Sequence, residues 1–238
     1  MEVLKAITFD FWDTLYKAPR MQELGDRRVA SLQHTLQQMG HPLGSDSIRT
    51  AVLAASRFAL QYQRDHGLDI TARGQLDCIL QYLQVDLDRE EWTKVYELYT
   101  TQLRDHPPEM NDGVSDTLPL LADKYKLGVI CNSGTSPGLI LRELMHKDGI
   151  LACFEFLVFS DEVGWAKPNL KIFQYALDNL QVKNHEAAHV GDDSSTDVFG
   201  AKNAGMKAVW LAPLLDERCT DCDYKINSIS ELIALFAT

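Results

Sequence analysis

Residues that could do chemistry stand directly or shortly after four apolar runs of the sequence, each short enough for one strand. In chain order they are Asp10; Asn132, Ser133 and Gly134; Ser160, Asp161 and Lys167; and Asp192, Asp193 and Asp197. Carboxylates follow three of these runs, and Lys167 precedes a predicted helix. Carboxylates gathered in one place repel one another unless a cation is bound among them.

The residue types in this group indicate a metal-assisted reaction at phosphorus. Oxygen ligands without histidine or cysteine favour Mg²⁺, which shares the phosphate oxygens of a bound substrate. An aspartate such as Asp10 can act as a nucleophile and form an aspartyl-phosphate. Lys167 can neutralise charge on that nucleophile and on a bound phosphoryl group. We therefore predict Mg²⁺ as the cofactor and a small anionic molecule as the substrate.

The elements that must position these residues alternate between strand and helix. Strands are predicted at residues 3–9, 127–131, 156–159, 188–190 and 208–211. Helices are predicted at about residues 114–124, 137–146, 169–180, 197–204 and 230–236. This order predicts an α/β fold, a Rossmann-like parallel sheet with helices on both faces. Ligands bind at the carboxyl ends of such strands, where the chemical residues fall.

A long helical block interrupts this order after the first strand. Between about residues 22 and 104, apolar side chains recur at helical spacing in four groups. The groups are Val29, Leu32, Leu36 and Met39; Ile48, Val52, Ala55, Phe58, Ala59 and Tyr62; Leu76, Ile79, Leu80 and Leu83; and Trp92, Val95, Tyr96 and Tyr99. Pro107 and Pro108 then stop helix formation. We predict an all-α domain at residues 16–110, inserted into a core domain of residues 1–15 and 111–238.

Composition excludes several classes of function. The 238 residues carry a formal net charge of −11, so little is gained from counterion release at nucleic-acid phosphates. No apolar run approaches membrane-spanning length, and the N-terminus lacks a signal-peptide pattern. Five scattered cysteines fit reduced thiols in the cytoplasm. We expect a cytoplasmic protein that binds neither nucleic acid nor membrane, and the sequence leaves monomer and homodimer open.

Taken together and in chain order, the motifs resemble those of the haloacid dehalogenase-like superfamily, most of whose members are Mg²⁺-dependent phosphohydrolases. The matching segments are residues 10–15, 131–132, 167–168 and 191–197. Each motif is weak alone, and the four together are specific. The helical insert resembles the C1-type cap of that superfamily. The resemblance implies a phosphohydrolase with an all-α cap over a Rossmann-like core.

The resemblance also implies roles for individual residues. Asp10 is implied to be the nucleophile and Lys167 to stabilise charge. The implied metal ligands are Asp10, the backbone carbonyl of Trp12, Asp192, Asp193 and Asp197. The implied substrate-binding residues are Trp12, Asn132, Ser133, Gly134 and Lys167, and Asn132 is also counted among the catalytic groups. From the residues alone, Asp193 and Asp197 could each cap a helix instead.

Trp12 departs from the phosphatase pattern, which usually has a second aspartate there as general acid and base. An indole cannot protonate a leaving group, and loss of such help typically lowers the rate by about 10²–10⁴. Asp13 is one residue out of place, and a shift of one residue in a turn changes side-chain direction. Cys131 replaces the usual Ser or Thr of the second motif and is a weaker donor, so Ser133 or Thr135 would have to supply a hydroxyl.

Three functions therefore remain open. The first is a Mg²⁺-dependent phosphohydrolase that forms an aspartyl-phosphate and prefers substrates whose leaving group needs little protonation, such as acyl and aryl phosphates. The second is a metal-independent 2-haloacid dehalogenase, since those relatives also have an aromatic residue at the position of Trp12. The third is a catalytically weak binding or regulatory protein.

Other polar residues are predicted to have surface or packing roles. The insert's arginines, among them Arg20, Arg27, Arg28 and Arg57, are predicted surface charges, and the sequence does not specify whether one reaches the substrate. Cys219 and Cys222 form a lone pair, which does not predict a zinc site. His189 is predicted to be a packed strand residue.

Overall fold

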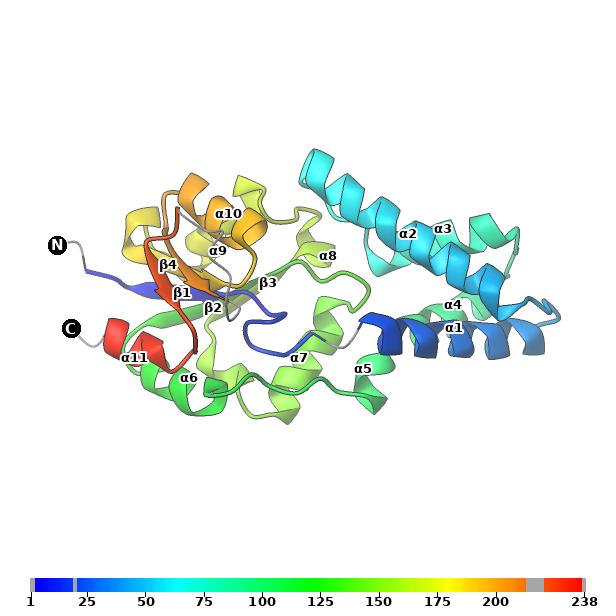
Figure 1. Ribbon diagram of the computed structural model, residues 1–238, viewed down its shortest axis with the longest axis horizontal. Helices are drawn as coiled ribbons and strands as arrows, with labels where there is room; N and C mark the ends of the chain where they lie inside the picture. The colour runs from blue at the N-terminus through cyan, green and yellow to red at the C-terminus, as the bar shows by residue number, and fades with distance from the viewer. Residues whose placement is uncertain (1–2, 19–20, 213–220, 237–238) are drawn as a thin grey trace.

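Six parallel strands form one sheet within residues 3–18, 21–212 and 221–236, which the computed structural model describes (Figure 1). The strands are β1 (Ala6–Phe9), β2 (Lys126–Cys131), β3 (Phe156–Phe159), β4 (Ala187–Gly191), β5 (Lys207–Leu211) and β6 (Tyr224–Ile226). Their order across the sheet is β3-β2-β1-β4-β5-β6. The order reverses at β1, so the first strand has β2 on one side and β4 on the other. Such a switch point is where open α/β sheets bind ligands.

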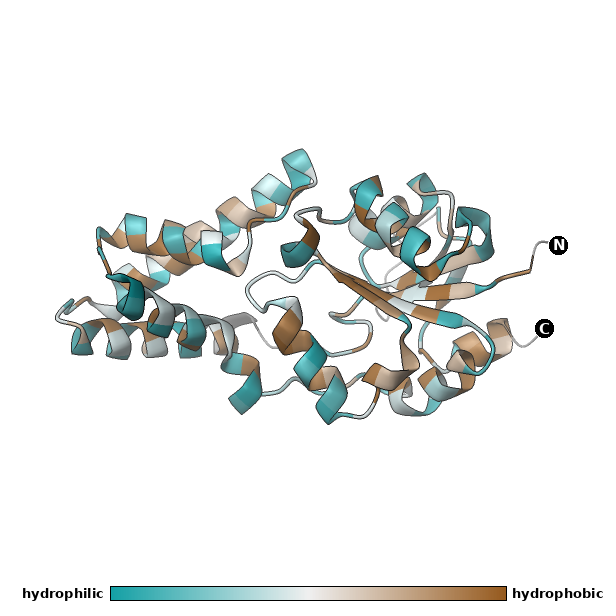
Figure 2. Ribbon diagram, turned by 180° about the vertical axis from the view of Figure 1, so that it is seen from behind, coloured by the Kyte–Doolittle hydropathy of each residue, from teal (hydrophilic) through white to brown (hydrophobic). Residues whose placement is uncertain are grey.

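Helices cover both faces of this sheet, as predicted. One face packs against α6 (Val114–Ala122), α7 (Gly138–Lys147) and α11 (Glu231–Leu235), and the other against α9 (Leu170–Leu180) and α10 (Phe199–Asn203). Alternate strand residues enter the two apolar clusters, with Ile7 and Phe9 on the first face and Ala6 on the second. Most strand residues are therefore apolar, and they appear as brown segments of the sheet in Figure 2.

Several short elements were not predicted from sequence. They are α8 (Ser160–Val163), the 3₁₀ turns η1 (Leu151–Cys153) and η2 (Asn184–Glu186), and strand β6. The predicted helix at 197–204 was wrong at its start: a π-helix, η3 (Ser194–Val198), precedes α10. The first strand is also shorter than predicted. Elements of three to five residues are too short for a periodic pattern to reveal.

The helical insert consists of α1 (Met21–Gln38), α2 (Ser45–His66), α3 (Ala72–Leu83), α4 (Arg89–Thr100) and the short α5 (Gln102–Asp105). The first four pack around a separate apolar cluster that includes Leu32, Ile48, Leu76 and Val95. Phe58 does not join it and is half exposed, which corrects its predicted place on the buried face of α2.

The chain passes between the two parts through a pair of hydrogen-bonded segments. The Lys17 N–H donates to the Glu109 carbonyl at 2.9 Å, and the Asn111 N–H donates to the Leu15 carbonyl at 2.9 Å. Tyr16 and Met110 form an antiparallel bridge between them. On this pairing we propose residues 16–110 as the cap and residues 1–15 and 111–238 as the core.

Candidate active site

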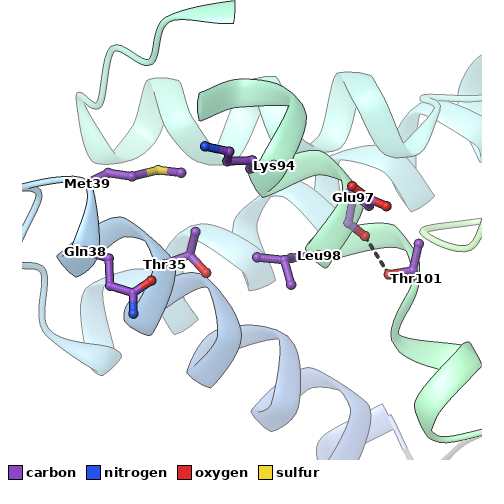
Figure 3. Close-up of a pocket in the computed structure, with 7 residues that line it drawn as sticks. All are labelled: Thr35, Gln38, Met39, Lys94, Glu97, Leu98 and Thr101. Atoms are coloured by element: carbon purple, nitrogen blue, oxygen red, sulfur yellow. Dashed lines mark hydrogen bonds between the residues drawn. The ribbon is translucent and has the colours of Figure 1, made fainter. Parts of the chain in front are cut away.

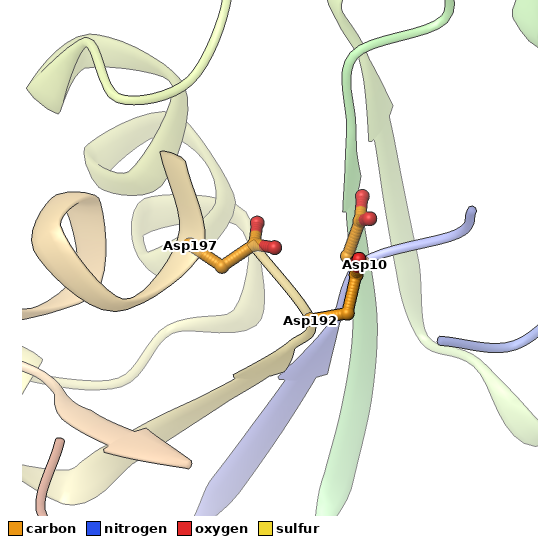
Figure 4. A group of neighbouring side chains, drawn as sticks. All are labelled: Asp10, Asp192 and Asp197. Atoms are coloured by element: carbon orange, nitrogen blue, oxygen red, sulfur yellow. The ribbon is translucent and has the colours of Figure 1, made fainter. Parts of the chain in front are cut away.

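Three carboxylates meet at the carboxyl edge of the sheet (Figure 4). Asp10 directly follows β1, Asp192 directly follows β4, and Asp197 lies in η3. One carboxylate oxygen from each lies within 4.8 Å of the others. The meeting arises because β1 and β4 are parallel neighbours with Phe9 opposite Val190, so the chain leaves both strands at the same height.

Lys167 lies inside this cluster and is buried, with only 2% of its surface exposed. Its Nζ is 2.5 Å from Oδ1 of Asp10 and 2.7 Å from Oδ1 of Asp197. Burial disfavours the ammonium, but these two carboxylates together raise the pKa of Lys167 above its ordinary value. Three carboxylates around one ammonium leave an excess of negative charge.

Burial, and then the charges of the neighbouring groups, shift the pKa values of these carboxylates. Burial raises the pKa of Asp10 to about 7, although Lys167 opposes the rise. Burial, together with the charge of Asp10, raises the pKa of Asp192 to about 8. Burial acts on Asp197 in the same direction, but Lys167 and His189 hold its pKa well below the ordinary value. Lys167 pairs with both Asp10 and Asp197 and compensates one of the three carboxylate charges, which leaves two in excess.

The donor set of this cluster fits a divalent cation. Three carboxylates are hard oxygen ligands, which match Mg²⁺ better than zinc or copper. Two uncompensated carboxylates match the two charges of such an ion. Asp10, Asp192 and Asp197 would hold it, with water and substrate oxygens completing its coordination.

The structure does not bring Asp193 into this group. Its carboxylate accepts hydrogen bonds from the backbone N–H groups of Ser195 and Thr196 at 2.7 and 3.1 Å, so it caps η3. Of the two roles that the sequence left open for these residues, Asp193 has that of a helix cap, whereas the Asp197 carboxylate lies in the cluster. A Cβ on Gly191 would lie 2.3 Å from Cγ of Asp197, so only glycine lets Asp197 approach β4 this closely.

The loop after β2 is held by bonds to neighbouring core segments. The side-chain amide of Asn132 accepts from the Lys167 N–H at 2.7 Å and donates to the Lys167 carbonyl at 3.1 Å, so it positions the lysine's backbone. The Ser133 hydroxyl donates to Asp161 at 2.5 Å, and its N–H donates to Ser160 at 2.9 Å. Both groups of Ser133 expected to bind substrate are thus used within the protein. Gly134 has a left-handed φ of 65°.

Trp12 lies beside the nucleophile position and is partly buried against the core. Its ring meets Phe11 edge-on, with centroids 4.9 Å apart. The next residue, Asp13, has a left-handed φ of 52° and accepts the N–H of Ala18 at 2.9 Å. This bond gives Asp13 a structural role in the turn. The Trp12 side chain therefore packs against the core, and Asp13 does not replace the missing aspartate in this arrangement.

His189 lies in β4 and is fully packed, as predicted. Its Nδ1 is 2.8 Å from Oγ1 of Thr8, and its Nε2 is 3.3 Å from Oδ1 of Asp197. Burial lowers the pKa of His189, so the ring is neutral at neutral pH. A neutral imidazole held by Thr8 can donate one N–H to Asp197 and fix the orientation of that carboxylate.

The cap contacts the core directly next to Lys167. The Asp69 N–H donates to the Gly164 carbonyl, and the Ala166 N–H donates to the Gly67 carbonyl, both at 3.0 Å. The Ser160 hydroxyl donates to the Asp69 carboxylate at 3.0 Å. The segment that ends at Lys167 is thus bonded to the cap.

These cap contacts were not found by sequence reasoning. Asp69 bonds to a residue 91 positions away, and Gln75, whose side chain donates to the Gly134 carbonyl at 3.4 Å, reaches across 59 positions. No local pattern marks such partners. Ser160 and Asp161 were noted at a strand end but given no role. Arg20 and Cys219 lie outside the described residues.

The cap also carries a groove of about 510 Å³ between α1 and α4 (Figure 3). It is lined by Thr35, Gln38, Met39, Lys94, Glu97, Leu98 and Thr101. None of these residues belongs to the carboxylate cluster, so the groove is separate from the site described above. Within the described residues, every helix is too short or too polar to cross a membrane.

Comparison with known proteins identifies similar chains. The family described as haloacid dehalogenase-like hydrolase matches residues 46–211. A glyceraldehyde 3-phosphate phosphatase of Methanothermobacter thermautotrophicus is 30% identical over 219 residues, which cover 90% of this chain and 88% of that protein.

Solved structures show the same fold. A HAD phosphatase from Thermococcus onnurineus superposes with a TM-score of 0.69 at 27% identity, covering 98% of this chain and 97% of that one. A 2-haloacid dehalogenase from Pseudomonas syringae superposes with a TM-score of 0.63 at 23% identity over 99% of both chains. Because a fold can host several chemistries, the second likeness concerns architecture alone.

Proposed function

This chain belongs to the haloacid dehalogenase-like hydrolases and is a phosphatase-like hydrolase, and we propose that it uses Mg²⁺ and an aspartyl-phosphate on Asp10 to hydrolyse a small phosphorylated metabolite. The observation that carries the proposal is the meeting of Asp10, Asp192 and Asp197 around Lys167. A dehalogenase of this fold, which needs no metal, would gain nothing from two carboxylates in excess of the lysine. We propose the cytoplasm as its location, on the pattern of its cysteines.

Each residue of the cluster has a proposed task. A carboxylate oxygen of Asp10 attacks phosphorus, the bond to the leaving oxygen breaks, and water then cleaves the aspartyl-phosphate to release phosphate. Lys167 balances charge on Asp10 and on the phosphoryl group. Asp10, Asp192 and Asp197 would hold Mg²⁺, with the Trp12 carbonyl as a further candidate. When bound, Mg²⁺ supplies positive charge that polarises the phosphoryl oxygens.

The loop after β2 has a supporting task in this proposal. Asn132 positions the Lys167 backbone and keeps one amide N–H for a phosphoryl oxygen. Ser133 and Gly134 shape the loop, because the hydroxyl and N–H of Ser133 already bond to Asp161 and Ser160. Preorganised donors of this kind stabilise transition-state charge without rearranging.

The leaving group is the part of the reaction that this chain assists least. Trp12 stands where a general acid is usual, and Asp13 is bonded into its turn. We therefore propose acyl or aryl phosphates, whose leaving groups need little protonation, as the best substrates. Alkyl phosphates should react more slowly by about 10²–10⁴ if proton transfer limits them.

The test is release of phosphate from an acyl, an aryl and an alkyl phosphate, and release of halide from a 2-haloacid, each with Mg²⁺ and with EDTA. We expect phosphate release that requires Mg²⁺ and ranks the acyl and aryl substrates first. Halide release in EDTA would instead favour the dehalogenase, the reading that the aromatic Trp12 supports. Inactivity on all four substrates would favour the binding or regulatory role.

Replacing Trp12 by aspartate should restore the missing acid. For Trp12→Asp we expect alkyl phosphate hydrolysis to rise by up to about 10²-fold, with little change for acyl phosphates. The variant should also unfold more easily, because the Trp12 ring packs on Phe11 and the core. Trp12→Phe is the matched control, since it changes the packing without adding an acid. An equal gain in both variants would show that pocket size, not protonation, limits the rate.

A further inference from the structure

Arg28 is a buried cation without a carboxylate partner among the described residues. It lies on α1 with only 8% of its surface exposed. Its Nε is 3.4 Å from the Tyr99 carbonyl and its Nη2 is 3.5 Å from Oγ of Ser136, both neutral acceptors at long distance. Burial lowers the pKa of Arg28; Tyr99 opposes this shift in part, and no carboxylate does. A buried charge is costly unless it is paired, so a counter-charge is expected here when the protein acts.

A second polar group beside Arg28 also lacks a partner. The guanidinium carbon lies 5.5 Å from the centroid of the Tyr99 ring. The hydroxyl of Tyr99 is buried and makes no hydrogen bond within the part of the chain that the structure describes. A buried hydroxyl without a hydrogen bond destabilises the folded protein. Arg28 and Tyr99 therefore offer a guanidinium without a carboxylate partner and an O–H group that can donate a hydrogen bond to an anion.

Arg28 contacts the loop that carries the phosphoryl-binding candidates. Ser136, which Arg28 contacts, lies four residues after Asn132, a separation of at most about 14 Å along the chain. Gln75, also from the cap, bonds to Gly134 of the same loop. The same loop thus joins Asn132, which bonds to Lys167, to Ser136, which contacts Arg28, so Arg28 lies on the cap side of the loop next to the site.

We propose that Arg28 and the Tyr99 hydroxyl bind a second anionic group of the substrate, a carboxylate or a phosphate, distinct from the phosphoryl group that Asp10 attacks. The inference rests on the proposed phosphohydrolase function and makes that function specific for doubly anionic metabolites. A guanidinium can hold either anion through two parallel N–H bonds. Arg28 is thus a specificity residue of the cap and takes no part in bond breaking.

A purely structural role is the competing explanation. Arg28 contacts the carbonyl of Tyr99 in the last turn of α4 (Arg89–Thr100), where a cation stabilises a helix end. Such a role predicts that replacing Arg28 lowers the stability of the protein and changes the activity toward all substrates by the same factor. A binding role predicts a change in selectivity between substrates that differ only by an anionic group.

The kinetic test uses two esters of equal length, 2-phosphoglycolate and 2-hydroxyethyl phosphate, with Mg²⁺. We expect the wild type to prefer the carboxylate-bearing ester. Arg28→Gln should raise KM for that ester by about 10- to 100-fold. For the neutral ester, KM and kcat of the variant should stay within a few-fold of the wild-type values. Arg27→Gln is the matched control, because Arg27 is the exposed neighbour on the same helix.

A binding test separates this inference from the proposed function. The increase in unfolding temperature produced by 3-phosphonopropionate is compared with that produced by propylphosphonate. The second compound has a methyl group in place of the carboxylate, and neither compound has a phosphate ester bond to hydrolyse. A larger shift for the carboxylate compound in the wild type, lost in Arg28→Gln, supports the anion site even if no substrate is turned over. Loss of turnover with this preference intact would overturn the proposed function alone.

Tyr99→Phe keeps the test decisive if Arg28→Gln does not fold. It removes only the unpartnered hydroxyl, so the unfolding temperature should stay or rise, while the preference for the carboxylate ester falls several-fold. Equal effects of Arg28→Gln on both esters, or an unchanged preference in both variants, would overturn the anion site and leave Arg28 as a support for α4.

Discussion

Asp10→Asn should abolish phosphate release and, in the absence of metal, stabilise the fold at neutral pH. The change removes the nucleophile, for which a loss of about 10⁴-fold or more is expected. It also removes a buried carboxylate that shares one lysine with Asp197. Removing this buried charge, and with it the repulsion from Asp197, should raise the free energy of unfolding in EDTA by roughly 1–3 kcal/mol above pH 7.

The pH dependence of this stabilisation has a definite sign. Burial raises the pKa of Asp10 from 3.8 to about 7, so between these values the folded state holds a proton that the unfolded state has lost. Stability of the wild type must therefore fall as pH rises through this window. Asp192, with a pKa raised to about 8, adds an effect of the same sign. The Asp10→Asn variant lacks the Asp10 part, so its advantage should grow from pH 4 to pH 7.

Denaturant unfolding in EDTA at several pH values, paired with phosphate assays, measures both effects. Asp13→Asn is the matched control, since it makes the same chemical change three residues later, where the side chain is exposed and bonded to Ala18. We expect it to keep activity within a few-fold and stability within about 0.5 kcal/mol. An Asp10→Asn variant that keeps its turnover would rule out Asp10 as the nucleophile, and one that is less stable than wild type at pH 8 would contradict the charge account.

Lys167→Met should have the opposite effect on stability while also impairing catalysis. Without the ammonium, Asp10 and Asp197 become uncompensated buried carboxylates, which typically costs about 3–5 kcal/mol. The loss should be smaller at pH 5 than at pH 8, because protonation of Asp10 removes part of the repulsion. Phosphate release should fall by about 10²–10³ or more, as for loss of a group that stabilises transition-state charge.

Added Mg²⁺ gives this prediction a second readout. If Asp10, Asp192 and Asp197 bind the ion, Mg²⁺ should stabilise the Lys167→Met variant more than the wild type. The reason is that loss of the ammonium makes the net charge of the variant's site more negative by one. Lys171→Met, on the exposed side of α9, is the control and should change stability by no more than about 0.5 kcal/mol. A Lys167→Met protein as stable as wild type at pH 8 would show that the two carboxylates are not held together by this lysine.

Local sequence rules determined the frame of this protein and the identity of its main chemical residues. Apolar runs of strand length, separated by helical patterns, predicted the parallel sheet, and parallel strands end at one edge whatever their order. That is why Asp10, Lys167 and Asp192 could be placed together from their positions alone. The helical period likewise predicted the inserted helices, because each helix must bury one face.

Only the tertiary structure decided which polar groups are free to act. Asp193 and Asp197 differ in sequence by four positions, yet one caps η3 and the other meets Lys167, since the backbone path of a π-helix sets their directions. The prediction that Arg28 is a surface charge was wrong, because Arg28 precedes buried Leu32 and Leu36 by four and eight residues and is buried with them on the inner face of α1. Whether a counter-charge meets it there depends on side chains more than 70 positions away. Such long-range partners follow from packing, which no local pattern in the sequence encodes.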